Sequence, residues 1–561
     1  VASEHSVLGL AMGVKPSPPY LNIAEQEGGV EASPGSNRSR LRNWRVAAAF
    51  SLAGLVALAL AASGQQRSAS ITHEEAKLRH PAVLQFEEAK SSKCADTFIA
   101  PKKPKTATEL NGVVLDDVCY KGSGPHHVFI IGDWGGKVDK GKLAAVSHLN
   151  HRWNQSFKFV YPIDANCQFA VRNQMRVKAI KSKPDYILNV GDNFYWGGVE
   201  DHCDAEDFTE MYSGGGSKVH KKDHVDQFKQ IFEDIYTGEG IDGKKWLGVL
   251  GNHDWGGWRF DMAWTQAVGY TWSKAKTNTG RWITPALYWA VTVKYEDFSV
   301  DYYFMDTNVW DALPFGERPP HNICGPHSPA RASCKSQGGP PARADPCKKW
   351  FEDLWEDQKA WLAKLVAKST AEWRMVVTHF PPYWGTEDWK KLTRDHEIDV
   401  IITGHRHSQN MHMKGDPVAK IWPEDTHSTA MNDFIDPTAW IVSGGGGGIT
   451  SEHVPDEFGN DDQYGFVDMT ISKEMAIFDA ISHQGIVRRT MKVPHSYSHG
   501  GRVKVEEDKK AAEKGAGKKE KERDSTKGAK RKEEGTKTKD AEKKDGKTEA
   551  KSESKKRETA Q

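Results

Sequence analysis

The sequence predicts an α/β protein in which sheet strands alternate with helices. Six apolar runs of strand length recur in the middle of the chain, and each ends at a glycine or a polar turn. The runs are HVFII (127–131), YILNV (186–190), WLGVL (246–250), RMVV (374–377), DVIIT (399–403) and WIVS (440–443). Apolar residues recur at helical spacing between several runs, most clearly over 351–366. In such a sheet, polar residues beyond the carboxyl ends of the strands line the functional site.

The folded domain is expected at 126–495, which holds nearly all of the Trp and the apolar runs. Residues 1–45 are rich in Ser, Pro, Gly and Asn and predict a disordered segment, and 63–125 predicts a polar lead-in. The end of the chain, 496–561, predicts a disordered, solvated tail of mixed charge. Acidic residues interleave with the Lys of this tail, and the formal net charge of the chain is +1, so nucleic acid is not an expected partner.

An uncharged apolar run spans 46–62 and follows Arg38, Arg40, Arg42 and Arg45. Its length suits either a signal anchor or a signal peptide, and the sequence leaves these two open. The basic flank precedes the run, so the rest of the chain is expected on the lumenal or outer side of the membrane. The sequence therefore predicts a secretory-pathway protein that is lumenal, secreted or membrane-anchored through 46–62.

Cysteine usage agrees with an oxidising compartment. The chain has seven Cys, at 94, 119, 167, 203, 324, 334 and 347, and no CxxC pair that would indicate a zinc or redox motif. Disulfides are therefore the expected use, with at least one thiol left over or paired between chains. Asn154-Gln155-Ser156 is an acceptor triplet for glycosylation and fits the same topology.

Side chains that can bind metal ions follow five of the strands, at the point where each strand ends. They are Asp133, Asp192, Tyr195, Asn252, His253, His379, His405 and His407. Taken singly, Asp133 or Asn252 is typical of a turn or helix cap, and His379 of a satisfied core histidine. Together, five such turns in chain order favour one shared site, and the glycine before most of them lets the backbone turn sharply off the strand.

Oxygen donors combined with imidazoles suit iron, zinc or manganese, whereas a site for a soft metal would contain thiolates. The candidates are too many for one cation but enough for two cations that share a carboxylate, an arrangement used in phosphoester hydrolysis. Tyr195 fits such a site, because a trivalent ion can hold a phenolate even though the free pKa of tyrosine is about 10.

The five turns resemble the ordered signature DxG, GDxxY, GNH(D/E), VxxH and GHxH of the purple acid phosphatases, within the calcineurin-like metallophosphoesterases. Here the motifs read Asp133-Trp-Gly135, Gly191-Asp-Asn-Phe-Tyr195, Gly251-Asn-His-Asp254, Val376-Val-Thr-His379 and Gly404-His-Arg-His407. The likeness is closest to the small, tartrate-resistant type and covers roughly 126–490. It implies an α/β calcineurin-like four-layer sandwich, with two mixed β-sheets flanked by helices and a metal site at the strand carboxyl ends.

The resemblance also implies a role for each candidate. A ferric ion would be held by Asp133, Asp192, Tyr195 and His407. A divalent ion (Fe, Zn or Mn) would be held by Asn252, His379 and His405, with Asp192 bridging the two ions. His253 would be the catalytic residue that contacts the phosphate and assists the leaving group.

The implied function is an acid phosphatase, a metal-dependent phosphoric monoester hydrolase in which metal-bound hydroxide attacks phosphorus in line. The expected substrate is a small phosphomonoester or a phosphoprotein. A membrane-tethered, non-catalytic scaffold on the same fold is the alternative, but scaffolds can lose ligands and this chain keeps all of them. A phosphodiesterase or nuclease is disfavoured, because related enzymes usually have His where Gly135 stands and Asp where Tyr195 stands.

Three features depart from or extend the resemblance. Small members carry a further phosphate-pocket histidine after the VxxH motif, whereas this chain has no His between His379 and His396. Asp254 fits a capping role as well as a role in the site. The insertion 307–349 is rich in Pro, Gly and Cys, and predicts either a disulfide-stapled, partly mobile lid over the site or a surface insertion without that role.

Overall fold

The computed structural model describes residues 94–139, 142–144, 161–164, 166–195, 197–199, 208–209, 227–255, 264–314, 316–317, 322–325, 333–414, 434–451 and 463–495. The chain divides into Val1–Ala76 and Lys77–Gln561, and every described residue belongs to the second unit. The predictions for 1–45, 46–62, Asn154 and the tail lie outside the described residues. Among the helices that are described, none combines the length and the apolar character needed to cross a bilayer.

One mixed sheet has eight strands in the order β1–β9–β10–β11–β12–β14–β13, with β2 paired to β9. Its strands are β1 (Val113–Val114), β2 (Val118–Cys119), β9 (Trp289–Lys294), β10 (Ser299–Phe304), β11 (Trp373–Val377), β12 (Val400–Thr403), β13 (Gln409–His412) and β14 (Ala439–Ser443). The strands from β10 to β14 along this order are parallel. β9 is antiparallel to β10 but parallel to β1 and β2, and β13 is antiparallel to β14. β12 and β14 are buried along their whole length, which explains their continuous apolar runs.

The second mixed sheet has seven strands in the order β17–β16–β15–β3–β6–β7–β8. Its strands are β3 (His126–Ile131), β6 (Tyr186–Asn189), β7 (Trp246–Gly248), β8 (Trp282–Ile283), β15 (Gly465–Ile471), β16 (Met475–Ser482) and β17 (Val487–Pro494). β3, β6, β7 and β8 are parallel, whereas β15, β16 and β17 form antiparallel pairs. A separate ribbon pairs β4 (Lys137–Asp139) with β5 (Lys142–Ala144).

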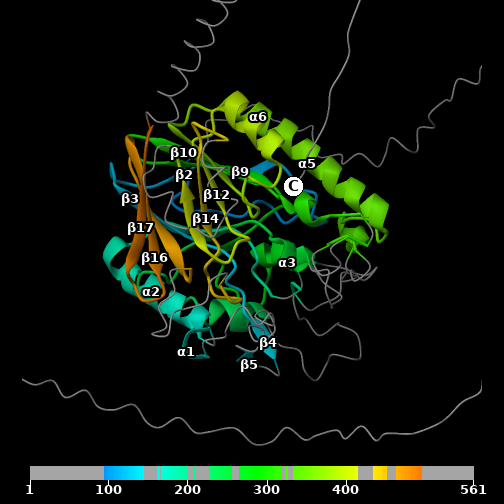
Figure 1. Ribbon diagram of the computed structural model, residues 1–561, viewed down its shortest axis with the longest axis horizontal. Coiled ribbons are helices and arrows are strands. Elements are labelled where there is room, and N and C mark those ends of the chain that lie inside the picture. Colours follow the sequence, from blue (N-terminus) through cyan, green and yellow to red (C-terminus); the bar gives the residue numbers. More distant parts are fainter. Residues whose placement is uncertain are drawn as a thin grey trace, which may run out of the picture. The chain divides into compact units, whose positions relative to one another are not determined.

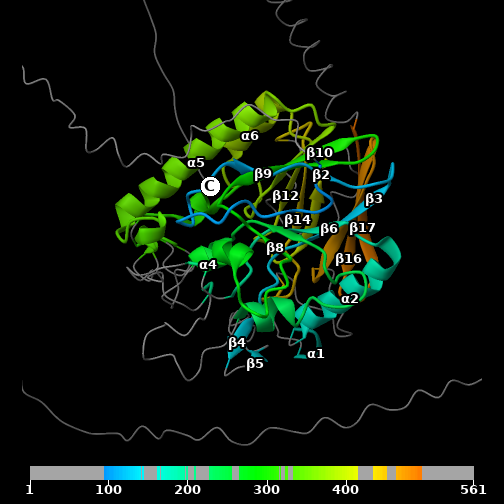
Figure 2. The same ribbon diagram turned by 180° about the vertical axis from the view of Figure 1, so that it is seen from behind.

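Helices cover the outer face of each sheet (Figures 1 and 2). On the eight-stranded sheet, α5 (Ala344–Val366) and α6 (Thr386–His396) bury apolar residues such as Leu354 and Trp389 in one cluster with Ile401 of β12. On the seven-stranded sheet, α2 (Cys167–Ser182) and the π-helix η3 (Phe228–Glu233) pack Met175 and Phe232 against Ile187 of β6. The shorter helices are α1 (Tyr161–Asp164), α3 (Asn252–Trp255), α4 (Trp264–Gly269), η4 (Tyr270–Trp272), η5 (Asn308–Asp311) and η8 (Lys335–Gln337).

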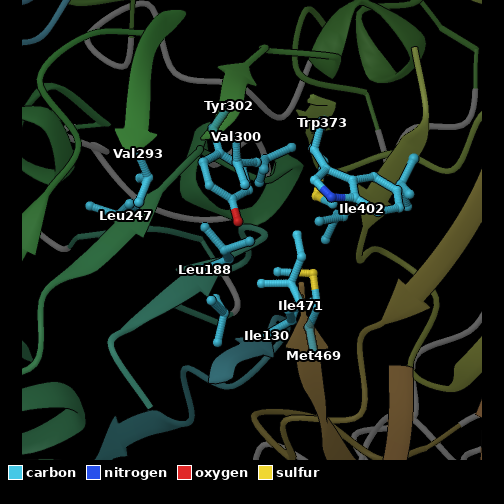
Figure 3. Packing of buried hydrophobic residues seen from close by; sticks show 14 of the residues in the cluster. Ile130, Leu188, Leu247, Val293, Val300, Tyr302, Trp373, Ile402, Met469 and Ile471 are labelled. Carbon is cyan, nitrogen blue, oxygen red and sulfur yellow. The ribbon is translucent and has the colours of Figure 1, made fainter. Parts of the chain in front are cut away.

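The inner faces of the two sheets meet in a third apolar cluster (Figure 3). Ile130, Leu188 and Leu247 from the seven-stranded sheet belong to the same buried cluster as Tyr302 and Ile402 from the eight-stranded sheet. Each fully buried side chain of this kind contributes about 1.5–3 kcal/mol relative to an exposed one. Helix, sheet, sheet and helix layers therefore follow one another, and the predicted four-layer sandwich of two mixed sheets is confirmed.

The six strands expected from the apolar runs are present as β3, β6, β7, β11, β12 and β14. The helix expected over 351–366 begins earlier, at Ala344, because Pro346 is compatible with the first turn of a helix. Residues 94–125, which the sequence placed in a polar lead-in, supply β1 and β2 to the eight-stranded sheet. They also bury Phe98, with 1% of its surface exposed, in the cluster between the sheets.

The cysteines form disulfides, as predicted. Cys94 is bonded to Cys119, and Cys324 to Cys347 within the insertion. Cys334 is also disulfide-bonded, whereas the thiol of Cys167 is buried and donates hydrogen bonds to backbone carbonyls.

Candidate metal centre

The predicted donors lie where the carboxyl ends of five strands meet. β3, β6 and β7 are parallel neighbours in one sheet, and β11 and β12 are parallel neighbours in the other. The two sheets are joined at this edge, because the backbone N–H of Gly132 after β3 donates to the carbonyl of Ser443 at the end of β14, at 2.8 Å. The loops that follow the strands of both sheets therefore meet at the carboxyl ends of those strands.

The backbone of this edge is tightly constrained. Asp133, Asp192 and His405 have φ values of 57°, 52° and 70°, a left-handed conformation that is uncommon for residues with a side chain and that clusters at functional sites. Glycine is needed at Gly251 because a Cβ there would lie 2.1 Å from Oδ1 of Asp192. The glycines thus permit close approach of the loops, in addition to the sharp turn that the sequence predicted.

Tyr195 is the centre of one group of donors. Its buried hydroxyl lies 3.0 Å from Oδ1 of Asp133, 2.9 Å from Oδ2 of Asp192 and 3.2 Å from Nε2 of His407. His407 Nε2 in turn lies 3.7 Å from Asp133 Oδ1. These are the four residues that the sequence assigned to the ferric ion.

Asn252 is the centre of a second group. Its Oδ1 lies 3.1 Å from Nε2 of His379 and 3.2 Å from Nδ1 of His405. His379 Nε2 is also 3.4 Å from Oδ1 of Asp192. Asp192 therefore turns one oxygen toward the Tyr195 group and the other toward the Asn252 group, a position from which a carboxylate can bridge two cations.

The chemistry of the donor set fits two cations. Ligand atoms of Asp133, Asp192 and His379 all lie within 4.8 Å of one another, and all three residues are buried. Carboxylate, phenol, amide and imidazole donors suit hard or borderline cations such as iron, zinc and manganese. The thiol of Cys167 donates to the carbonyls of Asp164 and Gly447 instead.

His253 lies beside both groups. Its backbone N–H donates to Oδ1 of Asp192 at 2.9 Å, and its ring centroid is 4.6 Å from that of Tyr195. Only 8% of its surface is exposed. Its neighbours are thus the Asp192 carboxylate and the Tyr195 phenol, and its contact with the substrate stays a prediction.

Burial and mutual charge shift the titration of this cluster when no cation is bound. Burial, followed by the charges of Asp133 and Asp192, raises the pKa of Tyr195 well above 10. Burial opposes protonation of His379, but the Asp192 carboxylate raises its pKa to about 9. Burial and the nearby His379 hold the pKa of His405 well below its usual range. The phenol therefore keeps its proton unless a cation reverses this balance.

Asp254 braces two of the loops. Its carboxylate accepts hydrogen bonds from the backbone N–H groups of Gly251 (2.8 Å), Asn193 (2.8 Å) and Phe194 (3.2 Å), and from Nδ2 of Asn193 (2.8 Å). Burial, aided by the charge of Asp192, raises its pKa to about 7. The sequence left open whether Asp254 caps a helix or takes part in the site, and these contacts with backbone N–H groups favour the capping role.

Sequence reasoning did not identify Asp311, which lies at the start of the insertion. Its Oδ2 accepts a hydrogen bond from Nδ2 of Asn252 at 3.1 Å. Nothing in the local sequence marks this contact, because the partners are 59 residues apart. His396, the next histidine after His379, lies in the last turn of α6, while aromatic side chains follow His379 directly.

A sequence model of the family described as calcineurin-like phosphoesterase matches residues 126–409, and the chain belongs to this family. Its curated relatives are purple acid phosphatases. It is 24% identical over 330 residues to purple acid phosphatase 17 of Arabidopsis thaliana, covering 56% of this chain and 74% of the relative. It is 24% identical over 297 residues to purple acid phosphatase 7 of the same plant, covering 51% of this chain and 66% of the relative. The resemblance to purple acid phosphatases is thereby confirmed.

Two solved structures are also similar. GAP50, the anchor in the inner membrane complex of Plasmodium, is 17% identical with a TM-score of 0.40, covering 66% of this chain and 88% of that chain. Purple acid phosphatase PPD1 from yellow lupin (Lupinus luteus) seeds is 14% identical with a TM-score of 0.34, covering 68% of this chain and 56% of that chain.

Proposed function

We propose that this chain is an acid phosphatase that hydrolyses phosphomonoesters. Membership in a phosphoesterase family supports the hydrolase class. The proposal of a two-metal phosphomonoesterase rests on the position of Asp192. One oxygen of Asp192 lies 2.9 Å from the hydroxyl of Tyr195, and the other lies 3.4 Å from His379 in the Asn252 group. A carboxylate shared between two donor groups can hold a pair of cations side by side, as in two-metal phosphoesterases.

Asp133, Asp192, Tyr195 and His407 would hold Fe(III), and Asn252, His379 and His405 would hold a divalent ion (Fe, Zn or Mn) together with Asp192. Such a pair supplies Lewis acidity that activates water and neutralises phosphoryl oxygens. Oxygen donors, including a phenolate, suit the trivalent ion, while a neutral amide suits the divalent one.

The residues of the chain itself orient the substrate and move a proton. His253 is held next to the Asp192 carboxylate by its own backbone N–H, and its imidazole would contact the phosphate and the departing oxygen. As a proton or hydrogen-bond donor it would stabilise the alcohol as the ester bond breaks, a contribution of about 10²–10⁴-fold in rate. Burial of the donors keeps bulk water away from the charged site.

The proposed substrate is a small phosphomonoester or a phosphoprotein, and the proposed location is the secretory pathway. The disulfides Cys94–Cys119 and Cys324–Cys347 support that location, because such bonds persist in oxidising compartments. Residues 46–62 are the proposed signal peptide or membrane tether.

A visible spectrum and metal analysis of the purified full-length chain, with phosphatase assays at acid pH, test the proposal. We expect iron plus a second metal, a broad band from a phenolate bound to Fe(III), and hydrolysis of phosphomonoesters. Tyr195→Phe should remove the band. A protein that binds both metals but hydrolyses no phosphomonoester would instead support the scaffold alternative.

A further inference from the structure

Within the loop between β11 and α6 (378–385), residues 380–385 bring aromatic rings to one side of the donor cluster. The ring of Phe380 stacks on His405, with centroids 4.0 Å apart and an interplanar angle of 28°. The ring of Trp384 stands edge-on to the same imidazole, at 4.8 Å and 88°. His405 is itself one of the predicted donors, with Nδ1 3.2 Å from Asn252 Oδ1, so Trp384 packs directly against the donor cluster.

Two of these aromatic residues keep part of their surface open. Phe380 is 1% exposed and acts as a packing residue, whereas Tyr383 and Trp384 are half-buried. The rings of Tyr383 and Trp384 lie 4.3 Å apart at 33°, and together they form what we name the aromatic ledge. A partly open aromatic face next to a polar site can stack on a planar group of a ligand.

The aromatic ledge is held in place before any ligand arrives. Arg406, which lies between two of the predicted metal donors, donates from Nη1 to the hydroxyl of Tyr383 at 3.4 Å. Trp310, from η5 of the insertion, packs so closely on Gly385 that a Cβ there would lie 2.1 Å from the indole. Gly385 also has a φ of +79°, which favours glycine. A surface fixed in this way loses little conformational entropy on binding.

We infer that Trp384, supported by Tyr383, is a specificity-determining residue that contacts the leaving group and favours alcohols carrying an aromatic ring over saturated alcohols of the same size. The inference rests on the proposed function. The reaction itself is unchanged: the ester P–O bond breaks, water supplies the oxygen of the new P–O bond, and the alcohol departs with a proton. A planar ring can stack on the aromatic ledge while its phosphate lies among the donors, whereas a puckered ring presents no flat face.

Benzyl phosphate and cyclohexylmethyl phosphate test this inference, because their sizes match and both release a primary alcohol. For the full-length protein we expect kcat/KM to be about tenfold higher for benzyl phosphate. Trp384→Leu should lower kcat/KM for benzyl phosphate about tenfold and leave the other substrate within about twofold, while Trp384→Phe should keep most of the preference. Trp272→Leu, a half-buried tryptophan whose indole donates to Pro101 at 2.8 Å, is the control and should retain the preference.

Equal losses on both substrates in Trp384→Leu, or no preference in the unaltered protein, would overturn the inference. Calorimetric binding of benzylphosphonate and cyclohexylmethylphosphonate tests the role of Trp384 independently of catalysis, and so distinguishes a failure of this inference from a failure of the proposed function. If the chain hydrolyses neither ester, the proposed function fails, yet tighter binding of benzylphosphonate that is lost in Trp384→Leu still supports the aromatic ledge. Equal binding of the two phosphonates to the unaltered protein contradicts it, even if no Trp384 variant folds.

Discussion

The side-chain amide of Asn252 donates a hydrogen bond from Nδ2 to Oδ2 of Asp311, at 3.1 Å, and this bond fixes which end of the amide the donor cluster receives. An amide has one accepting and one donating end. With Nδ2 directed to Asp311, Oδ1 faces His379 and His405, at 3.1 and 3.2 Å. The start of the insertion therefore orients a predicted metal donor.

Asp311→Ala should weaken binding of the divalent cation by about tenfold, because partners that orient a ligand typically contribute 10–100-fold to metal affinity. The visible absorption band expected from Tyr195 should stay unchanged, because Asp311 contacts Asn252, which belongs to the other donor group. Titration of the divalent metal, followed by calorimetry, measures the effect. Asp353→Ala is a matched control, because Asp353 pairs with the exposed Lys349 on α5. Loss of both metals to the same extent would contradict this orienting role.

Gly135→Ala should disrupt the centre. A Cβ at Gly135 would lie 1.7 Å from the carbonyl oxygen of Asn193, so the loops after β3 and β6 would have to separate. We expect loss of metal binding and a lower Tm than in Gly280→Ala. Gly280 has a φ of +71° with nothing within 4 Å of a Cβ, so that variant measures only the backbone cost, about 1 kcal/mol. Equal Tm values and metal contents in the two variants would show that the close contact is unimportant.

His253→Ala should lower kcat by about 10²–10⁴-fold with little change in metal content or in the visible band. The backbone N–H that donates to Asp192 remains in this variant, so the bridging carboxylate keeps that hydrogen bond. Steady-state kinetics and metal analysis on the same preparation separate the two effects. A parallel fall in metal content and kcat would assign His253 to the metal ligands instead.

Asp306 should make stability fall as pH rises. Burial raises its pKa to about 6 despite hydrogen bonds from Asn308 and Trp255. A carboxyl whose pKa is higher in the folded than in the unfolded state binds more protons when the protein is folded. The stabilisation of the folded state that results from protonating Asp306 is therefore complete below pH 4 and is lost between about pH 4 and 6. We expect the unfolding free energy of the unaltered protein, relative to Asp306→Asn, to be on the order of 2–3 kcal/mol larger at pH 4 than at pH 7. Denaturant titrations at both pH values measure this difference, and an unchanged difference would rule out the effect.

The lid role of the insertion remains a prediction. Deleting 315–340 should change the apparent KM or the turnover, because a lid controls access to the site. The deletion also removes Cys324 and Cys334, and so breaks the bond of Cys324 to Cys347 and the disulfide of Cys334. The double variant Cys334→Ser, Cys347→Ser controls for these losses, and kinetics equal to those of the unaltered chain in the deletion variant would dismiss the lid.

The sequence could place the candidate donors near one another because all of them follow the ends of five strands, and the order of strands in a parallel sheet brings such positions to one edge. That they bind metal ions stays a prediction. Asp311 and Trp384 could not be found in that way, since their contacts depend on the path of an insertion and a loop. Phe98 was missed for a different reason: it is a single buried aromatic in a stretch whose composition is mostly polar. Local patterns predict strands and their ends, whereas contacts between distant loops require coordinates.

The two donor groups draw on both sheets of the sandwich. Asp133, Asp192 and Asn252 follow strands of one sheet, and His379 and His405 follow strands of the other. Each ion bound there would cross-link the two halves of the protein, and its binding energy would add to that of the native state, by about 2.7 kcal/mol when free ion is at a hundredfold excess over its dissociation constant. Starvation for metal would thus shorten the lifetime of the polypeptide as well as remove its activity, and protease resistance would report how well the cell is supplied with the metals that bind there.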